Sequence, residues 1–291
     1  MSKKMITWII IVLLVLGTMA YVAIRRWALH HLVIRQRAEN RRHLEWTDMG
    51  PTPGADKKYS PQGISWVEGK LIFANSWDDE RSRVYEINPE TMEQLRHFDM
   101  PPEAVHTSGL AWDGSYLWAV DHIADTAYKL DLEASFESGK AQVAGSFDTT
   151  LEGTSACSMV RFDGQRCLAI SDFMHSRKTI FVRPSAAVEQ GTAAGQIAFA
   201  YENEGFSQGL EYIDGYLYES ENKLGTNVLN KIDIAQLQET RCARKATVRQ
   251  YPAPSYGVED LAWDGKAIWT SDETAYKFFK TQLGRSEDDG H

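Results

Sequence analysis

Short runs of alternating apolar and polar residues, rich in aromatic and β-branched side chains, fill most of the chain after residue 43. Such runs form pairs around an acidic residue and a glycine at Glu68-Gly69, Asp113-Gly114, Asp163-Gly164, Asp214-Gly215 and Asp264-Gly265. The glycines are 45, 50, 51 and 50 residues apart. An acidic residue followed by glycine tolerates the positive φ of a two-residue type I′ turn. The pattern therefore predicts five β-hairpins in five repeats.

Each predicted hairpin is followed by a polar loop and a third strand, and four repeats have a fourth strand. We expect third strands at Val84–Asn88, Tyr128–Leu132, Ile180–Arg183, Val228–Ile232 and Tyr276–Phe279, and fourth strands such as Leu95–Met100 and Thr247–Tyr251. Four antiparallel strands repeated five times are typical of a β-propeller. Because long helical periodicity is absent, residues 43–291 are predicted to form an all-β, five-bladed β-propeller.

The fifth repeat has no fourth strand of its own, because only a polar tail follows Phe279. Residues 43–51 resemble residues 94–102, which form the outer strand of the first repeat. We therefore expect Leu44–Met49 to be the outer strand of the last blade, so that the two ends of the chain close the ring. This closure would place the chain's entry on one face and the loops after each second strand on the opposite, outward face.

Residues 6–24 are an uncharged apolar stretch long enough to cross a bilayer as a helix. A cleaved signal peptide is the alternative, since Thr18-Met19-Ala20 resembles a cleavage site, but the apolar run continues past it. The chain is thus divided into a single transmembrane anchor (1–24), a basic juxtamembrane helix or linker (25–42) and the propeller (43–291). Six arginines between residues 25 and 42 place the propeller in the cytoplasm by the positive-inside rule, unless they bind headgroups as an amphipathic helix.

The charge is distributed unevenly along the chain. The protein has a formal charge of −9, but residues 1–42 carry +7 and the predicted propeller −16. An acidic domain without a basic stripe repels phosphates. Nucleic acid is therefore excluded as an expected partner, whereas the membrane is expected to contact the N-terminal helix.

The three cysteines are Cys157, Cys167 and Cys242. A hairpin turning at Asp163-Gly164 places Cys157 opposite Ile170, about 10 Å from Cys167 along the ladder. That separation exceeds the reach of a disulfide. Free buried thiols are therefore favoured over a redox or metal site.

Polar residues recur where each second strand is expected to end. They include Asn75, Asp121, Asp172, Glu219 and Asp272, together with His122, His175, Glu221, Asn222 and Glu273, while the loops entering the blades add Gln62, His106, Ser155, Gln208, Glu259 and Asp260. Carboxylates that converge on one face could bind a ligand or a structural Ca²⁺, or act as acid and base. The alternative for any one of them is that it caps a turn through local backbone amides. Asn75, Asp121, Asp172 and Asp272 are our candidate ligand-binding residues in this ring.

One stretch carries a more specific resemblance. The fourth repeat reads Phe206-Ser207-Gln208-Gly209-Leu210-Glu211-Tyr212 and, after Gly215, Leu217-Tyr218-Glu219-Ser220. These segments resemble the Phe-Thr-Gln-Gly-Leu and Leu-Tyr-Glu-Ser segments of the plant and bacterial glutaminyl cyclases (glutamine cyclotransferases), which are five-bladed propellers. The family continues Glu-Ser-Thr-Gly, whereas Glu221-Asn222 follows here, and the family has these segments near the start of the propeller.

The resemblance implies a reaction and residues for it. Phe206 and Gln208 would contact the substrate, and Glu219 would be the catalytic carboxylate. The enzyme would be an acyltransferase that cyclises an N-terminal glutamine and releases ammonia, with the carboxylate carrying a proton. The resemblance also favours a propeller outside the cytoplasm, against the arginine count, so the topology stays open.

Two other functions remain open from the sequence. One is a non-catalytic propeller that binds a protein, a glycan or a small ligand on the outward face. The other is a metal-dependent, lactonase-like hydrolase that uses the acidic ring. A peptide or another small ligand on the outward face is the expected partner. The identity of any cofactor is unknown.

Overall fold

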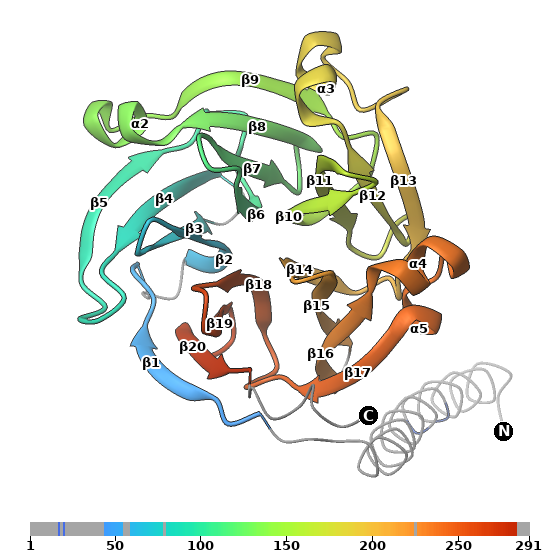
Figure 1. Cartoon of the computed structure of the whole chain (residues 1–291). Coiled ribbons are helices and arrows are strands. Elements are labelled where there is room, and N and C mark those ends of the chain that lie inside the picture. Colours follow the sequence, from blue (N-terminus) through green and yellow to red (C-terminus); the bar gives the residue numbers. More distant parts are fainter. Residues whose placement is uncertain are drawn as a thin grey trace, which may run out of the picture.

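The computed structural model describes residues 44–54, 59–77, 80–223 and 226–283, together with Gly17 and Ala20. Five four-stranded antiparallel sheets surround a central axis as the blades of a propeller (Figure 1). From the inner to the outer strand, blade one is β2 (Tyr59–Val67), β3 (Lys70–Trp77), β4 (Arg81–Ile87) and β5 (Gln94–Asp99), and blade two is β6 (Thr107–Trp112), β7 (Leu117–Asp121), β8 (Thr126–Asp131) and β9 (Gln142–Asp148). The all-β, five-bladed prediction is confirmed.

The other blades repeat this order. Blade three is β10 (Thr154–Phe162), β11 (Gln165–Asp172), β12 (Lys178–Val182) and β13 (Ile197–Glu202); blade four is β14 (Ser207–Ile213), β15 (Tyr216–Lys223), β16 (Thr226–Asp233) and β17 (Thr247–Pro252). Blade five is β18 (Val258–Trp263), β19 (Ala267–Asp272), β20 (Lys277–Gln282) and β1 (Thr47–Pro51). The last sheet therefore contains both ends of the described chain.

Strand β1 closes the ring, as expected, but it begins three residues later than predicted. Thr47 pairs with Lys280 and Pro51 with Lys277. Leu44 and Trp46 instead pack beside blade four, where the Trp46 indole N–H donates to the Pro252 carbonyl at 3.0 Å. Since Pro51 lies at the outward end of β20, the chain enters β1 from the opposite face, which we call the turn face.

The acidic-glycine pairs form the five hairpin turns, but in two ways. In blades one, three and four both residues have positive φ, as at Asp163 (47°) and Gly164 (72°), which is the expected geometry. In blades two and five only the glycine has positive φ. There the carboxylate accepts two backbone N–H bonds and an indole N–H, for example from Trp118 to Asp113 at 2.8 Å.

Short helices fill the connections between the third and fourth strands, which the strand pattern does not predict. They are α2 (Leu132–Ser138), α3 (Pro184–Gln190), α4 (Ile234–Thr240) and α5 (Ala243–Ala246). Blade one has only a turn at this place, which explains its shorter repeat of 45 residues. The segments that end α2, α3 and α4 form parallel bridges with the outer strand of the preceding blade: Asp99 with Lys140, Asp148 with Thr192 and Glu202 with Cys242.

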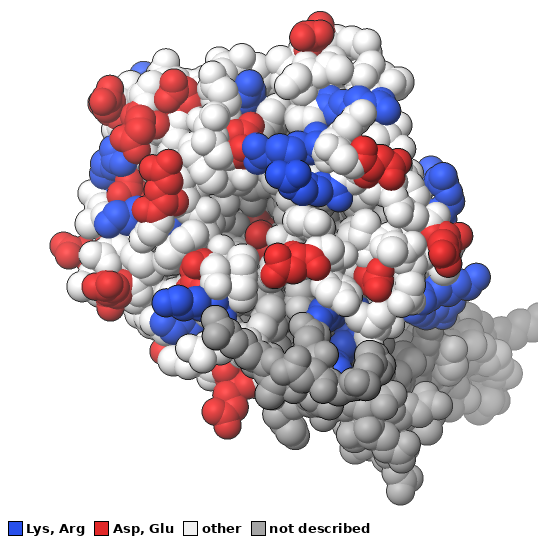
Figure 2. Space-filling model, in the orientation of Figure 1, with Lys and Arg blue, Asp and Glu red and all other residues white. Residues whose placement is uncertain are grey.

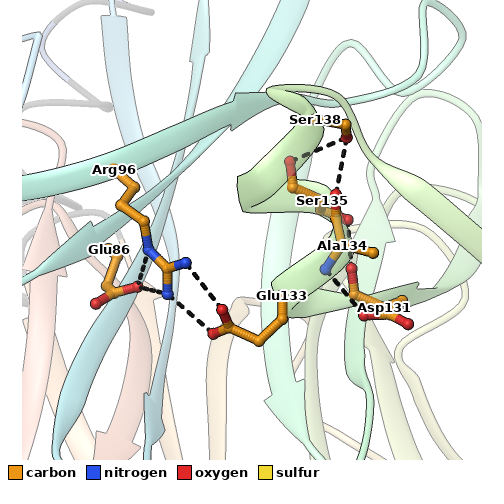
Figure 3. Close-up of polar contacts among 7 residues, drawn as sticks. All are labelled: Glu86, Arg96, Asp131, Glu133, Ala134, Ser135 and Ser138. Carbon is orange, nitrogen blue, oxygen red and sulfur yellow. Dashed lines mark hydrogen bonds and ion pairs between the residues drawn. The ribbon is translucent and has the colours of Figure 1, made fainter.

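Arg96 makes a further connection between blades one and two (Figure 3). Its guanidinium donates to both oxygens of Glu133 in α2, at 2.8 and 2.9 Å, and to Glu86 at 2.7 Å. It also lies over the Phe136 ring, 4.5 Å from the centroid. The helices and this ion-pair cluster thus fasten neighbouring blades at their outer edges.

The inner strands approach so closely at the axis that a side chain is excluded at some positions. A Cβ on Gly209 would lie 2.6 Å from the Asp260 Cα, and one on Gly109 would lie 2.8 Å from the Ala156 Cα. The buried Asp260 carboxylate accepts backbone N–H bonds from Ile64, Leu110 and Leu210, which belong to three other blades. Asp260 is therefore a structural hub.

In the orientation of Figure 2, the surface is hollowed at the centre of the ring, and side chains of both charge signs border the hollow.

The cysteine and membrane predictions have different outcomes. Cys157 pairs with Ile170 across the hairpin, as predicted, and Cys157 and Cys167 are buried free thiols, whereas the free thiol of Cys242 is only half-buried, contrary to the expectation for it. Within the described ranges, no helix has both the length and the apolar character needed to span a bilayer. The predicted anchor (1–24) and juxtamembrane segment (25–42) lie outside those ranges apart from Gly17 and Ala20, so they stay predictions.

Candidate ligand-binding site

A cavity of about 360 Å³ opens on the outward face where the five inner strands begin. Its floor is formed by one residue from each blade, directly before the point where the inner strands approach most closely: Gln62, Ser108, Ser155, Gln208 and Glu259. Side chains alternate between the two faces of a strand, so these residues project into the cavity while their neighbours pack between blades. The propeller thus brings together side chains that are up to 197 residues apart in the chain.

The walls come from the loops that follow the second strands and from the loops between blades. They include His106, His122, Phe173, Met174, Phe206, Asn222 and Glu273. Phe173 and Phe206 meet edge to face, with ring centroids 6.1 Å apart, and their backbones form an isolated antiparallel bridge. The cavity is therefore polar at its floor and partly aromatic at its wall, as ligand sites commonly are.

A directed chain of hydrogen bonds runs along one side of the cavity through three blades. The His106 Nε2 lies 3.1 Å from the Gln62 Oε1, the Gln62 amide donates to the Ser60 Oγ at 2.9 Å, and the Ser60 hydroxyl donates to Glu273 at 3.1 Å. Since the Gln62 oxygen is an acceptor, His106 carries its proton on Nε2. Beside this chain, the Gln208 amide donates to Glu259 at 3.3 Å.

Three titratable groups of the cavity are shifted toward their neutral forms. Burial raises the pKa of Glu273, and the Ser60 hydrogen bond opposes this shift in part. Burial, and then the nearby Glu273 and Asp272, raise the pKa of Glu259 well above its usual range. Burial and the neighbouring His106 lower the pKa of His122. Since neither Lys nor Arg occurs among the described lining residues, no permanent positive charge in the cavity balances the two carboxyl groups.

Two of the predicted site residues, Phe206 and Gln208, line this cavity. Four others occupy equivalent places at the outward ends of the second strands and do not line it: Asn75, Asp121, Asp172 and Asp272. The three aspartates hold loops, since Asp172 accepts four backbone N–H bonds and Asp121 accepts three. The Asn75 amide donates to the Pro53 carbonyl and to the Tyr85 hydroxyl. The residue that directly follows each of these three aspartates lines the wall of the cavity instead.

Glu219 lies elsewhere, although the resemblance suggested it as the catalytic residue. It pairs with Leu210, and the same register position holds Phe73, Ala119, Ile170 and Thr270 in the other blades. Its side chain is fully buried beside Tyr201, Ser207 and Asn230, away from the cavity. Burial, and then the nearby Glu221, raise its pKa to about 8. Glu221, rather than Glu219, occupies the ring position of Asp121 and Asp172.

No group of three or more His, Cys, Asp or Glu side chains suited to a metal ion occurs among the residues the structure describes. A structural Ca²⁺ and the lactonase-like, metal-dependent chemistry therefore stay predictions. A second hollow of about 450 Å³ lies on the turn face and is lined by residues such as Asp163, Asp214 and Gln238.

Sequence reasoning missed Ser60, Ser108, Phe173 and Met174. Ser108 could have been found from the repeat, because it precedes Gly109 as Gln62 precedes Gly63 and Gln208 precedes Gly209. Phe173 directly follows Asp172, so strand alternation alone would have placed one of the two in the cavity. Nothing in the pattern decides which of the pair faces inward.

Comparison with known proteins bears on the fold. No protein-family model matches the chain, and no curated protein matches it. The crystal structure of the Myxococcus xanthus glutaminyl cyclase superimposes with a TM-score of 0.59 at 13% identity, covering 84% of this chain and all of that one. The two proteins share the five-bladed propeller fold. The resemblance expected from the fourth repeat is thus confirmed at the level of fold. A protein of unknown function from Bacteroides caccae superimposes with a TM-score of 0.47 at 12% identity, over 72% of this chain and 73% of that one.

Proposed function

We propose that the cavity on the outward face binds a small ligand with a free amine, and that this ligand is the amino terminus of a peptide. The observation that carries the proposal is the pair of carboxyl groups that line the cavity, the buried Glu259 and the half-buried Glu273, both with raised pKa and with neither Lys nor Arg among the described lining residues. An ammonium group would supply the missing charge and lower both pKa values. The Phe173 and Phe206 rings give the rest of the terminal residue an apolar surface.

Titration calorimetry of the full-length protein in detergent tests this proposal. A short peptide with a free amino terminus should bind, and the same peptide acetylated at that terminus should not. Because the carboxyl groups ionise when the ammonium enters, binding should release protons, so the apparent enthalpy should depend on the ionisation enthalpy of the buffer. Glu273→Gln should weaken binding and reduce this release. Equal affinity for the free and acetylated peptides would rule out recognition of the amine.

A second candidate function is cyclisation of an N-terminal glutamine, the reaction of the family that the fourth repeat resembles and whose Myxococcus xanthus member shares the fold. It is favoured by a carboxyl group of raised pKa beside aromatic walls and an amide, Gln208, that orients it. The α-amine would attack the side-chain amide carbon, forming a C–N bond while the bond to the departing nitrogen breaks. Glu259 or Glu273 would pass the amine proton to that nitrogen, which leaves as ammonia.

Ammonia release from a Gln-initiated peptide tests the second candidate, with two variants separating the possible catalysts. Glu273→Gln should reduce the rate, whereas Glu219→Gln should not, because Glu219 does not line the cavity. Loss of activity in Glu219→Gln alone would instead assign the catalytic role to Glu219, the residue matched by the sequence resemblance. If the peptide binds but no ammonia is released, the protein is a non-catalytic propeller that binds its ligand.

The proposal also includes a single-pass membrane anchor at residues 6–24. The chain enters β1 from the turn face, so an anchored propeller would present the cavity away from the bilayer. Resistance to carbonate extraction tests the anchor. Protection of the propeller from protease added outside the cell distinguishes a cytoplasmic from an extracytoplasmic location.

A further inference from the structure

Three large apolar side chains are exposed on loops of the outward face, and we call these loops the rim of the cavity. Ile123 is 54% exposed, Met174 59% and Tyr256 67%, the three highest values among the exposed large hydrophobic residues described. The remaining ones, Leu95, Val143, Ile197 and Val248, are less exposed and lie on the outer strands β5, β9, β13 and β17. The three most exposed of these apolar side chains in the described propeller thus lie on loops of the outward face, and one of them, Met174, also lines the cavity.

The loop that presents Met174 is held in place from several directions. Met174 has a φ of 67°, which non-glycine residues rarely adopt. Its backbone N–H donates to the Gly205 carbonyl at 3.0 Å, and the Phe173 N–H donates to the Gly153 carbonyl at 2.9 Å. The Asp172 carboxylate accepts four further backbone N–H bonds from the same loop. These contacts fix the backbone that presents the Met174 side chain to the cavity.

Backbone hydrogen bonds also position the loops that carry the other two rim residues. Ile123 follows Asp121 by two positions, as Met174 follows Asp172, and its backbone N–H donates to the Asp121 carboxylate at 3.0 Å. Tyr256 precedes Gly257, whose carbonyl accepts the backbone N–H of Glu273 at 2.8 Å. Tyr256 therefore lies next to the wall that carries one of the two carboxyl groups of the amine site.

We propose that the rim recognises the second and third residues of a peptide whose first residue occupies the cavity, and that it selects apolar side chains there. This inference rests on the proposed function. Successive side chains of an extended peptide point to opposite sides and advance about 3.3 Å per residue. A peptide that leaves the cavity would thus direct one side chain toward Met174 and Ile123 and the next toward Tyr256. The carboxyl groups at the centre favour a chain with a free amine over a lipid surface or a second copy of this acidic protein.

The test compares two peptides with the same first residue, one with Leu and Phe and the other with Ser and Gln at positions two and three. The apolar peptide should bind the full-length protein about tenfold more tightly or better, because burying one such side chain is worth at least a tenfold change in affinity. Met174→Ser and Tyr256→Ser should each remove most of that preference, and Tyr256→Ser, which lies outside the cavity lining, should leave the affinity for the polar peptide unchanged. Val143→Ser, an equally conservative change on the outer strand β9, is the matched control and should have no effect.

Three results would overturn the inference. Equal binding of both peptides, unaffected by the rim variants, would show that the amine site works without the rim. Failure of both peptides to bind would remove the proposed function together with this extension of it. Co-sedimentation of the protein with phosphatidylcholine and phosphatidylglycerol vesicles that is lost in Met174→Ser and Tyr256→Ser, without an effect on peptide preference, would identify the rim as a membrane contact.

Discussion

Replacing Glu219 by glutamine should make the propeller more stable at neutral and alkaline pH. The side chain is 0% exposed, and burial and then the nearby Glu221 raise its pKa from 4.5 to about 8, although Ser207 and Asn230 oppose the shift. The folded state therefore binds a proton that the unfolded state releases above pH 4.5. The stability that this group contributes is complete below that pH and is lost as the pH rises toward 8. Glutamine keeps the shape but does not ionise.

The size of the effect follows from the proton balance. Between the two pKa values, one proton taken up on folding lowers the free energy of unfolding by about 1.4 kcal/mol per pH unit. From about pH 6 to about pH 7.5, wild type should thus lose about 2 kcal/mol relative to Glu219→Gln. Glu259 and Asp260, whose pKa values burial also raises, are common to both proteins and cancel in the difference, whereas the interaction of Glu219 with Glu221 is lost in the variant and is part of the measured effect.

Urea unfolding of wild type and Glu219→Gln at both pH values measures this difference. The matched control is Glu137→Gln, which changes an exposed glutamate in α2 and should leave the pH dependence unchanged. A constant difference between wild type and Glu219→Gln across the range would refute the reasoning, because it would mean that Glu219 is ionised in the folded protein. The same result would point to a cation or a donor that stabilises the carboxylate.

Three further changes test how the blades are joined. Gly209→Ala should destabilise the fold by about 3 kcal/mol, because the added Cβ would lie 2.6 Å from the Asp260 Cα, and denaturant unfolding measures this loss. Arg96→Met removes the ion pairs with the exposed Glu133 and the buried Glu86 and should cost about 2 kcal/mol, because Glu86 loses its charged partner; thermal unfolding that matches wild type in low and high salt would contradict a role for them. Removing residues 43–50 exposes the edge of β20 and should unfold the whole propeller cooperatively; a soluble propeller with wild-type circular dichroism would contradict ring closure by β1.

The sequence predicts the architecture because its signals are local and repeated. Each acidic-glycine pair marks a turn, and five similar spacings define five blades. The likeness of residues 43–51 to residues 94–102 also predicts the closure by β1. The predicted start of β1 is wrong by three residues because Leu44 and Trp46 pack against blade four, a tertiary preference that the pattern does not carry.

The helices and part of the site could not be predicted, for different reasons. A helix of seven residues such as α2 is too short for its periodicity to be distinguished from a loop. At the ends of the second strands, adjacent polar residues such as Asp121 and His122 point in opposite directions, and composition does not say which enters the cavity. The Leu-Tyr-Glu-Ser match placed Glu219 in a catalytic role by its letters, whereas the register places it in the packing between blades.

The central claim is that the ligand's amino terminus enters the outward cavity, and photo-crosslinking tests it most directly. A peptide with a free amine and a photoreactive diazirine side chain at position one would be bound to the full-length protein, irradiated, digested and analysed by mass spectrometry. The account predicts crosslinks to Phe173, Met174 or Phe206, and their suppression by the unlabelled peptide. Crosslinks that map to Asp163, Asp214 and Gln238 in the hollow on the turn face would contradict it.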